Sequence, residues 1–118
     1  MRSVFYLGTC STCTKIIKEL NLSKDFELRD IKKSPMSEEE VDLMAKMAGS
    51  YEAIFSRKAM KYRALGLHEK QLSEKDYRQY ILQEYTFLKR PVCILDDKIF
   101  VGNTKKVVSE LAETLSNE

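Results

Sequence analysis

The pattern of apolar and polar residues predicts two short β-strands in the first third of the chain. The first run, at residues 3–7, ends at Gly8. The second run, at 26–31, has the alternation that is typical of a strand packed on one face. In this second strand we expect three apolar side chains to point towards the core: Phe26, Leu28 and Ile31.

A second pair of strands is predicted near the C-terminus. Pro91 precedes the unbroken apolar run VCIL, which is typical of a central strand buried on both faces. Asp96 and Asp97 then form a turn, and the run KIFV returns as the strand neighbouring VCIL. This hairpin would supply antiparallel pairing.

Helical spacing of apolar residues separates these strands. A helix at about 14–20 places Ile16, Ile17 and Leu20 on one stripe, and a last helix does the same with Val107, Val108, Leu111 and Leu115. In the middle of the chain, two helices are predicted to begin at capping residues that each face an acid three positions later. These pairs are Ser37 with Glu40 and Ser73 with Asp76. The helix that begins at Ser73 is expected to bury one face, made of Tyr77, Tyr80, Ile81 and Tyr85.

The order of elements is therefore β, α, β, three helical pieces, β, β, α. The outer parts would form an α/β fold with a mixed four-stranded sheet, and about residues 33–86 would be a helical insertion packed on it. We expect one domain over residues 1–118, because no Gly/Ser-rich or Pro-rich linker divides the chain.

Composition narrows the class of protein. The chain is 43% hydrophobic and 32% charged, as in a soluble globular protein, and its net charge is only +2. That balance gives no electrostatic reason to expect direct nucleic-acid binding. No apolar run approaches the ~20 residues of a membrane helix, and the N-terminus lacks the apolar region of a signal peptide. We therefore expect a cytoplasmic protein that does not bind membranes.

The stretch YLGTCSTCTK carries the chemistry. Cys10 falls after the first strand and at the start of the first helix, where unpaired N–H groups and the helix dipole favour a thiolate. Cys13 follows three residues later, within reach for a disulfide. The pair predicts a redox cycle in which Cys10 attacks a disulfide or other soft electrophile and Cys13 resolves the intermediate.

Two other interpretations of the pair remain open. Cys10 and Cys13 could be half of a zinc site, with Cys93 and His68 as the remaining ligands. They could also be two ordinary core cysteines. Cys93 itself, inside VCIL, is expected to be a core residue, and His68 a surface loop residue. We expect no metal and no other cofactor.

Three segments together resemble the arsenate reductase / Spx family: CSTC between strand and helix, FSRKAMKYRALGL in the middle and KRPVCILDDKIFVGN near the end. The resemblance covers nearly the whole chain and implies a thioredoxin-like fold with a helical insertion. Cys10 matches the family's catalytic or redox-sensing cysteine, and Pro91 matches the cis-proline that faces it. Arg90 and Arg57 match arginines that, in arsenate reductases, hold the oxyanion and lower the thiol pKa.

The chain departs from glutathione-dependent arsenate reductases at two places. These carry one cysteine followed by an arginine, whereas here Cys13, Thr14 and Lys15 follow Cys10. A third oxyanion-binding arginine is absent from KIFVGN. Both departures weaken the case for arsenate as substrate, and the CxxC pair resembles the Spx side of the family, whose members are disulfide switches that bind RNA polymerase.

The sequence therefore predicts a thiol-disulfide oxidoreductase of arsenate-reductase-like type, with an Spx-type redox-sensing regulator as the alternative. The residues beside the cysteines, Thr9, Ser11 and Thr12, are expected to bind substrate or stabilise the thiolate. The implied partner is a thiol reductant, which could be glutathione, glutaredoxin or thioredoxin. RNA polymerase is the partner that the alternative implies.

Overall fold

The computed structural model describes all residues from 1 to 118, and they divide into two compact units. The sheet unit comprises Met1–Ser34 and Arg90–Glu118, and the helical unit comprises Pro35–Lys89. None of the helices is long and apolar enough to cross a membrane. The single domain with an insertion at 33–86 stays a prediction.

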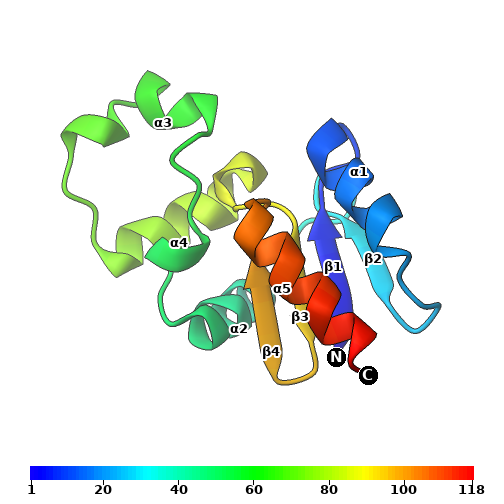
Figure 1. Cartoon of the computed structure of the whole chain (residues 1–118). Coiled ribbons are helices and arrows are strands. Elements are labelled where there is room, and N and C mark those ends of the chain that lie inside the picture. The colour runs from blue at the N-terminus through cyan, green and yellow to red at the C-terminus, as the bar shows by residue number, and fades with distance from the viewer. The chain divides into compact units, whose positions relative to one another are not determined.

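The sheet unit contains the predicted mixed four-stranded sheet (Figure 1). Its strand order is β2-β1-β3-β4, with β1 and β2 parallel and the other two pairings antiparallel. The apolar run VCIL is a central strand with every residue buried, as predicted. The strands are β1 (Arg2–Tyr6), β2 (Glu27–Asp30), β3 (Val92–Leu95) and β4 (Lys98–Val101).

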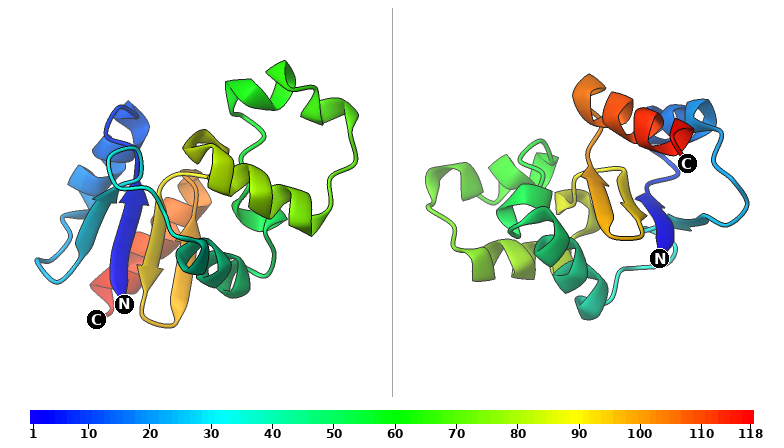
Figure 2. Two further views of the ribbon diagram at one scale, coloured as in Figure 1. Left: turned by 180° about the vertical axis from the view of Figure 1, so that it is seen from behind. Right: turned by 60° about the horizontal axis from the view of Figure 1, so that its bottom comes forward.

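Two amphipathic helices, α1 (Ser11–Leu20) and α5 (Lys105–Ser116), cover one face of this sheet (Figures 1 and 2). Both helices begin at the same end of the sheet, the end to which β1 and β4 point. The core beneath them is a cluster of buried residues that come from β1, the loop before β2, β3 and α5. These residues are Val4, Phe26, Cys93, Leu95 and Leu111. Leu111 of this core, and Ile17, Leu20 and Leu115 that pack against it, belong to the apolar stripes that the helical spacing predicted.

The expectation for Leu28 was wrong. Leu28 is 49% exposed, whereas Phe26 and Ile31 are buried as predicted. The reason is that β2 is the edge strand of the sheet, so part of its surface is left uncovered. An alternating pattern shows which residues share a face, but it does not show how far the covering helices extend over that face.

The helical unit contains α2 (Glu38–Ala48), α3 (Met60–Ala64) and α4 (Glu74–Gln83), joined by short 3-10 turns. The predicted capping pairs at the starts of α2 and α4 are both present as reciprocal hydrogen bonds. Tyr85 does not continue the buried face of α4, because Glu84 takes an extended conformation and Tyr85 begins a 3-10 turn. Phe55 lies at the centre of this unit's aromatic core, stacked on Phe87 with ring centroids 5.1 Å apart.

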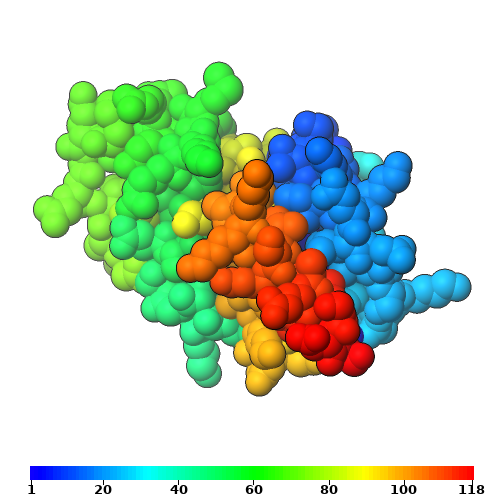
Figure 3. Space-filling model, in the orientation of Figure 1, coloured from blue at the N-terminus to red at the C-terminus, as the bar shows by residue number.

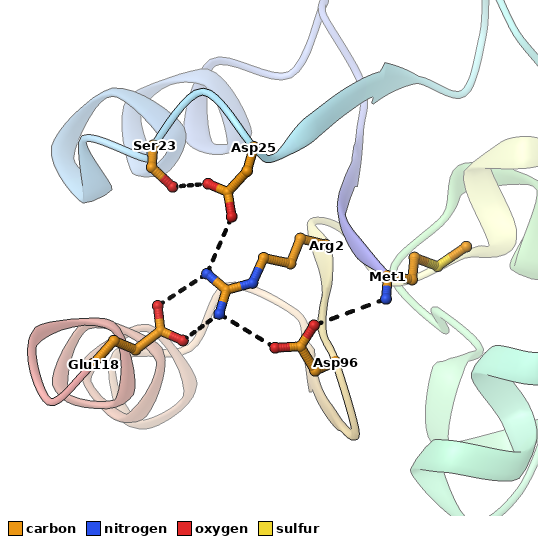
Figure 4. Close-up of polar contacts among 6 residues, drawn as sticks. All are labelled: Met1, Arg2, Ser23, Asp25, Asp96 and Glu118. Atoms are coloured by element: carbon orange, nitrogen blue, oxygen red, sulfur yellow. Dashed lines mark hydrogen bonds and ion pairs between the residues drawn. The ribbon is translucent and has the colours of Figure 1, made fainter.

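A polar cluster around Arg2 ties together distant parts of the sheet unit (Figure 4). The Arg2 guanidinium donates to both carboxylate oxygens of Glu118, at 3.0 and 2.6 Å, and to Asp96 at 3.2 Å. Asp25, which also accepts a hydrogen bond from Ser23, lies 3.4 Å from the same guanidinium. The cluster therefore joins the first strand, the loop before β2, the β3–β4 turn and the last residue of the chain.

Candidate active site

The turn between β1 and α1 places Cys10 directly before the first residue of the helix. Cys10 is the N-cap, with an extended backbone, and its N–H donates to the carbonyl of Leu7 at 2.9 Å. Its own carbonyl accepts from the N–H of Thr14 at 3.2 Å, the first hydrogen bond of the helix. Cys10 thus lies where unpaired amide groups and the positive end of the helix dipole gather.

Gly8 lets this turn pass close to the end of the adjacent strand β2. A Cβ atom at Gly8 would lie only 2.6 Å from Oδ2 of Asp30, at the end of the adjacent β2. The same carboxylate accepts from the N–H of Lys32 through its other oxygen, at 3.1 Å. The carboxylate of Asp30 is therefore held against the turn at Gly8, and no local sequence signal pointed to this contact, because it depends on the parallel pairing of β1 with β2.

The two cysteines of the CxxC pair differ in exposure and in acidity. Both are free thiols; Cys10 is partly exposed and Cys13 is buried. Burial tends to raise the pKa of Cys10, but hydrogen bonds from the backbone and side chain of Cys13, the charge of Arg90 and the backbone N–H of Thr12 outweigh it. The net result is a Cys10 pKa below that of an ordinary cysteine.

Cys13 is shifted in the opposite direction. Burial, followed by its hydrogen bond to Cys10, raises its pKa to about 11. A backbone hydrogen bond from Leu7 and the charge of Arg90 oppose this shift without cancelling it. The arrangement is therefore a partly exposed sulfur with a lowered pKa beside a buried thiol with a raised pKa that donates a hydrogen bond to it.

Arg90 and Pro91 enter the site from the start of β3. The Arg90–Pro91 peptide bond is cis, as the resemblance implied. The carbonyl of Pro91 accepts from the N–H of Gly102 at 2.9 Å, which holds this segment against the end of β4. The positive charge of Arg90 lowers the pKa of both Cys10 and Cys13, so the structure brings this arginine together with the two thiols.

The hydroxyl residues beside the cysteines are all exposed. Thr9 lies in the turn before Cys10, and Ser11 and Thr12 form the first two positions of α1. Thr12 contributes through its backbone N–H, which is one of the groups that lower the Cys10 pKa. The carbonyl of Ser11 accepts from Oγ1 of Thr14 at 3.0 Å. The substrate-binding role expected for these three side chains stays a prediction.

Arg57 belongs to the helical unit and is held there by neighbours in that unit. Its guanidinium donates to Glu52 at 2.6 Å and to the hydroxyl of Tyr77 at 2.9 Å, and it lies over the Tyr77 ring. Sequence reasoning did not anticipate these partners. The predicted role of Arg57 beside the Cys10 thiolate stays a prediction.

The ligands that a zinc site would need are not gathered. Cys93 is buried in the core of the sheet unit, where burial raises its pKa to about 12. His68 lies in the helical unit with its ring 6.3 Å from that of Tyr62. No group of three or more His, Cys, Asp or Glu side chains is arranged to hold a metal ion. Cys93 is thus the core residue that its apolar run predicted.

Comparison with known proteins identifies the family. The family model described as "ArsC family" matches residues 5–111, which include the CxxC pair, Arg90 and Pro91. The chain belongs to the ArsC family. The recognition made from CSTC, YRALGL and RPVCIL is therefore confirmed at the level of the family, while membership of its Spx branch stays a prediction.

Several proteins resemble this ArsC family member in sequence or structure. The uncharacterized protein YusI of Bacillus subtilis (strain 168) is 29% identical over 102 residues, which are 83% of this chain and 86% of YusI. An ArsC family related protein from Bacteroides fragilis superposes with a TM-score of 0.76 at 21% identity, covering 93% of this chain and 96% of its own. The arsenate reductase from Vibrio cholerae superposes with a TM-score of 0.76 at 20% identity, over 92% and 97%. The structural matches establish the thioredoxin-like fold.

Proposed function

We propose that this ArsC family protein is a thiol-disulfide oxidoreductase in which Cys10 is the nucleophile and Cys13 the resolving thiol. The observation that carries the proposal is the contrast within the pair. The accessible Cys10 has a lowered pKa, and the buried Cys13 beside it has a raised one. An ionised, accessible sulfur is the attacking group in thiol-disulfide exchange, and a protonated neighbour within hydrogen-bond reach is ready to complete it.

The proposed cycle has two exchange steps. The Cys10 thiolate attacks one sulfur of a disulfide R–S–S–R, which forms Cys10–S–S–R and releases R–S⁻, and this thiolate takes a proton from solvent. Cys13 then loses its proton and attacks the Cys10 sulfur, which releases the second R–S⁻ and leaves a Cys10–Cys13 disulfide. The substrate gains two electrons and the protein loses two, so an external dithiol or two monothiols must restore the starting state.

Arg90 supports both of these steps electrostatically. A guanidinium beside the pair stabilises the Cys10 thiolate before attack, and its charge also lowers the cost of ionising Cys13 during resolution. A disulfide is a better-supported substrate than arsenate, because the segment after Pro91, VCILDDKIFVGN, lacks the third arginine that would bind an oxyanion. Arsenate reduction is therefore kept as a substrate to assay and not as the proposed activity.

A redox-sensing regulator is the second candidate, and the same CxxC pair favours it. Two adjacent thiols, one with a lowered pKa and one with a raised pKa, can act as a switch that forms a disulfide under oxidation. This candidate predicts that an RNA polymerase subunit binds the protein in only one oxidation state. If RNA polymerase is absent from pull-downs with both the reduced and the oxidised protein, the regulator candidate is ruled out.

The decisive experiment uses three variants and a low-molecular-weight disulfide. Cys10→Ser should abolish reduction of the disulfide, because Ser does not supply a thiolate. Cys13→Ser should stop turnover after the first step and accumulate a mixed disulfide on Cys10 that mass spectrometry detects. Cys93→Ala, which removes the third thiol without placing a polar group in the core, is the matched control and should turn over as the parent protein does. Full activity in Cys10→Ser contradicts the proposal.

A further inference from the structure

Gly102 follows the last residue of β4 and donates a hydrogen bond to the segment that carries Arg90. The pairing of β3 with β4 sets Val92 opposite Val101, so Pro91 and Gly102 are the next pair along the same register. The N–H of Gly102 donates to the carbonyl of Pro91 at 2.9 Å. Because proline has no N–H, the reciprocal backbone hydrogen bond of this pair cannot form. The attachment of Pro91 to the end of β4 therefore depends on the N–H of Gly102.

The backbone conformation of Gly102 is one that a residue with a side chain rarely adopts. Its φ of 93° lies in the left-handed region, where the chain turns away from β4. Thr104 is already the N-cap of α5, and the start of α5 lies next to the first turns of α1 (Figure 3). Nothing lies within 4 Å of the position that a Cβ would take at Gly102. A side chain there would therefore strain the backbone without crowding a neighbour.

Arg90 lies opposite the turn that carries Cys10. In the antiparallel pairing of β1 with β3, Phe5 is opposite Val92. Continued beyond the ends of both strands, the same register sets Leu7 opposite Arg90. The carbonyl of Leu7 accepts from the N–H of Cys10 at 2.9 Å. The strand pairing thus places Arg90 across from the β1–α1 turn, in agreement with the action of its charge on both thiols.

Resting on the proposed function, we infer that Gly102 is a positioning residue for the redox pair. Its N–H fixes the carbonyl of Pro91, and the fixed segment keeps the guanidinium of Arg90 beside the two thiols. The left-handed backbone lets Gly102 give this hydrogen bond and still direct the chain into α5. Gly102 therefore acts through Arg90, and its loss weakens the stabilisation of the Cys10 thiolate without removing any charge.

The test measures the pH profile of Cys10 alkylation in variants of Gly102. Gly102→Ala strains the left-handed backbone, so the hydrogen bond to Pro91 weakens and Arg90 acts less on the thiolate. At a pH below the inflection, alkylation by iodoacetamide should slow by about threefold, the loss of thiolate when the pKa of Cys10 rises by about 0.5. Gly102→Asn should shift the profile in the same direction but less, because asparagine accepts the left-handed region at a smaller cost.

Two other glycines provide matched controls for backbone strain. Gly49 and Gly66 also have positive φ values, 104° and 71°, and open space at the Cβ position, but they lie in the helical unit. Gly49→Ala and Gly66→Ala should lower the urea midpoint as Gly102→Ala does. They should leave the pH profile of Cys10 unchanged, so a loss of stability alone does not mimic the expected result.

A double variant shows whether Gly102 acts through Arg90. Once Arg90→Gln has removed the charge, the placement of that side chain no longer affects the thiolate. Arg90→Gln combined with Gly102→Ala should therefore give the Cys10 profile of Arg90→Gln alone. A further upward shift in the double variant would mean that Gly102 acts on Cys10 by another route, and would overturn the inference.

The remaining outcomes separate this inference from the proposed function. If Gly102→Ala folds and gives the parent profile, Gly102 has no positioning role and the proposed function stands. If Gly102→Ala does not fold, Gly102→Asn decides, and a parent profile in that variant overturns the inference. If Cys10 of the parent protein already has the inflection of a free cysteine, ~8.5, the proposed function fails and the inference fails with it.

Discussion

The Cys13 thiol donates a hydrogen bond to the sulfur of Cys10, and the pKa values of the two residues move apart as a result. This hydrogen bond stabilises the Cys10 thiolate and at the same time holds the proton on Cys13. The position of Cys10 at the start of α1 and the charge of Arg90 act in the same direction on the nucleophile. One local arrangement therefore prepares both the attacking and the resolving group.

Replacement of Arg90 should make Cys10 less acidic. Arg90→Gln removes a positive charge that favours the thiolate, so the pKa of Cys10 should rise towards its ordinary value. The pH dependence of Cys10 alkylation by iodoacetamide, followed on the isolated peptide, measures this shift. Arg90→Lys keeps the charge and should shift the profile less. Identical profiles for Arg90→Gln and the parent protein would show that Arg90 does not act on this thiol.

The buried thiol of Cys13 should make the folded protein less stable at alkaline pH. Its folded pKa is raised to about 11, above the ~8.5 of an unfolded cysteine. Between these values the folded state holds more protons, so this contribution is fully present below ~8.5 and is lost as the pH rises through about 11. Urea unfolding from about pH 8 to about pH 10 should give a falling midpoint, with a shallower fall in Cys13→Ser than in the parent.

Cys10→Ser is the control for this titration. The folded pKa of Cys10 is depressed, so its contribution to stability is present above the unfolded pKa and is lost as the pH falls through the folded value. Its removal should therefore leave most of the alkaline fall in place. A fall that vanishes in Cys10→Ser and persists in Cys13→Ser would reverse the assignment of the two pKa shifts.

Phe55 should be a principal source of stability in the helical unit. Its side chain is fully buried, and its ring lies 4.8 Å from that of Tyr77 and 5.1 Å from that of Phe87. Phe55→Ala leaves a cavity and should lower the free energy of unfolding by about 3–5 kcal/mol. Met60→Ala, at a side chain that is 90% exposed, should change it by less than ~0.5 kcal/mol. Similar losses in the two variants would contradict this core.

The Arg2 cluster should contribute a stabilisation that depends on salt. Arg2→Gln breaks the paired contacts with Glu118 and the contact with Asp96, and so should lower the thermal midpoint. The difference from the parent should shrink at high salt, because exposed charges are screened. Lys98→Gln, which removes a charge on β4 outside any ion pair, should have little effect. A difference that salt leaves unchanged would mean that Arg2 acts by packing.

Local patterns predicted the framework of the site well. The unbroken run VCIL identified a central buried strand, and a strand followed by Gly8 and an amphipathic stripe placed Cys10 at the start of a helix. The capping pairs located the starts of α2 and α4, since each depends on two side chains three residues apart. Features encoded within a few residues are therefore the ones that sequence reasoning recovers.

Features that depend on long-range pairing were missed. The exposure of Leu28 follows from β2 being an edge strand, which its own alternation does not reveal. The approach of Asp30 to Gly8 needs the register between β1 and β2. The contact of Arg2 with Glu118 joins residues 116 positions apart.

The acidity of Cys10 is the claim on which the proposed function depends, and alkylation kinetics resolved by peptide measure it directly. With the reduced parent protein, iodoacetamide labelling as a function of pH should give Cys10 an inflection clearly below the ~8.5 of a free cysteine. Cys13 should remain unlabelled until the pH approaches about 11. An inflection for Cys10 at or above ~8.5, or labelling of Cys13 at lower pH than Cys10, would contradict the account.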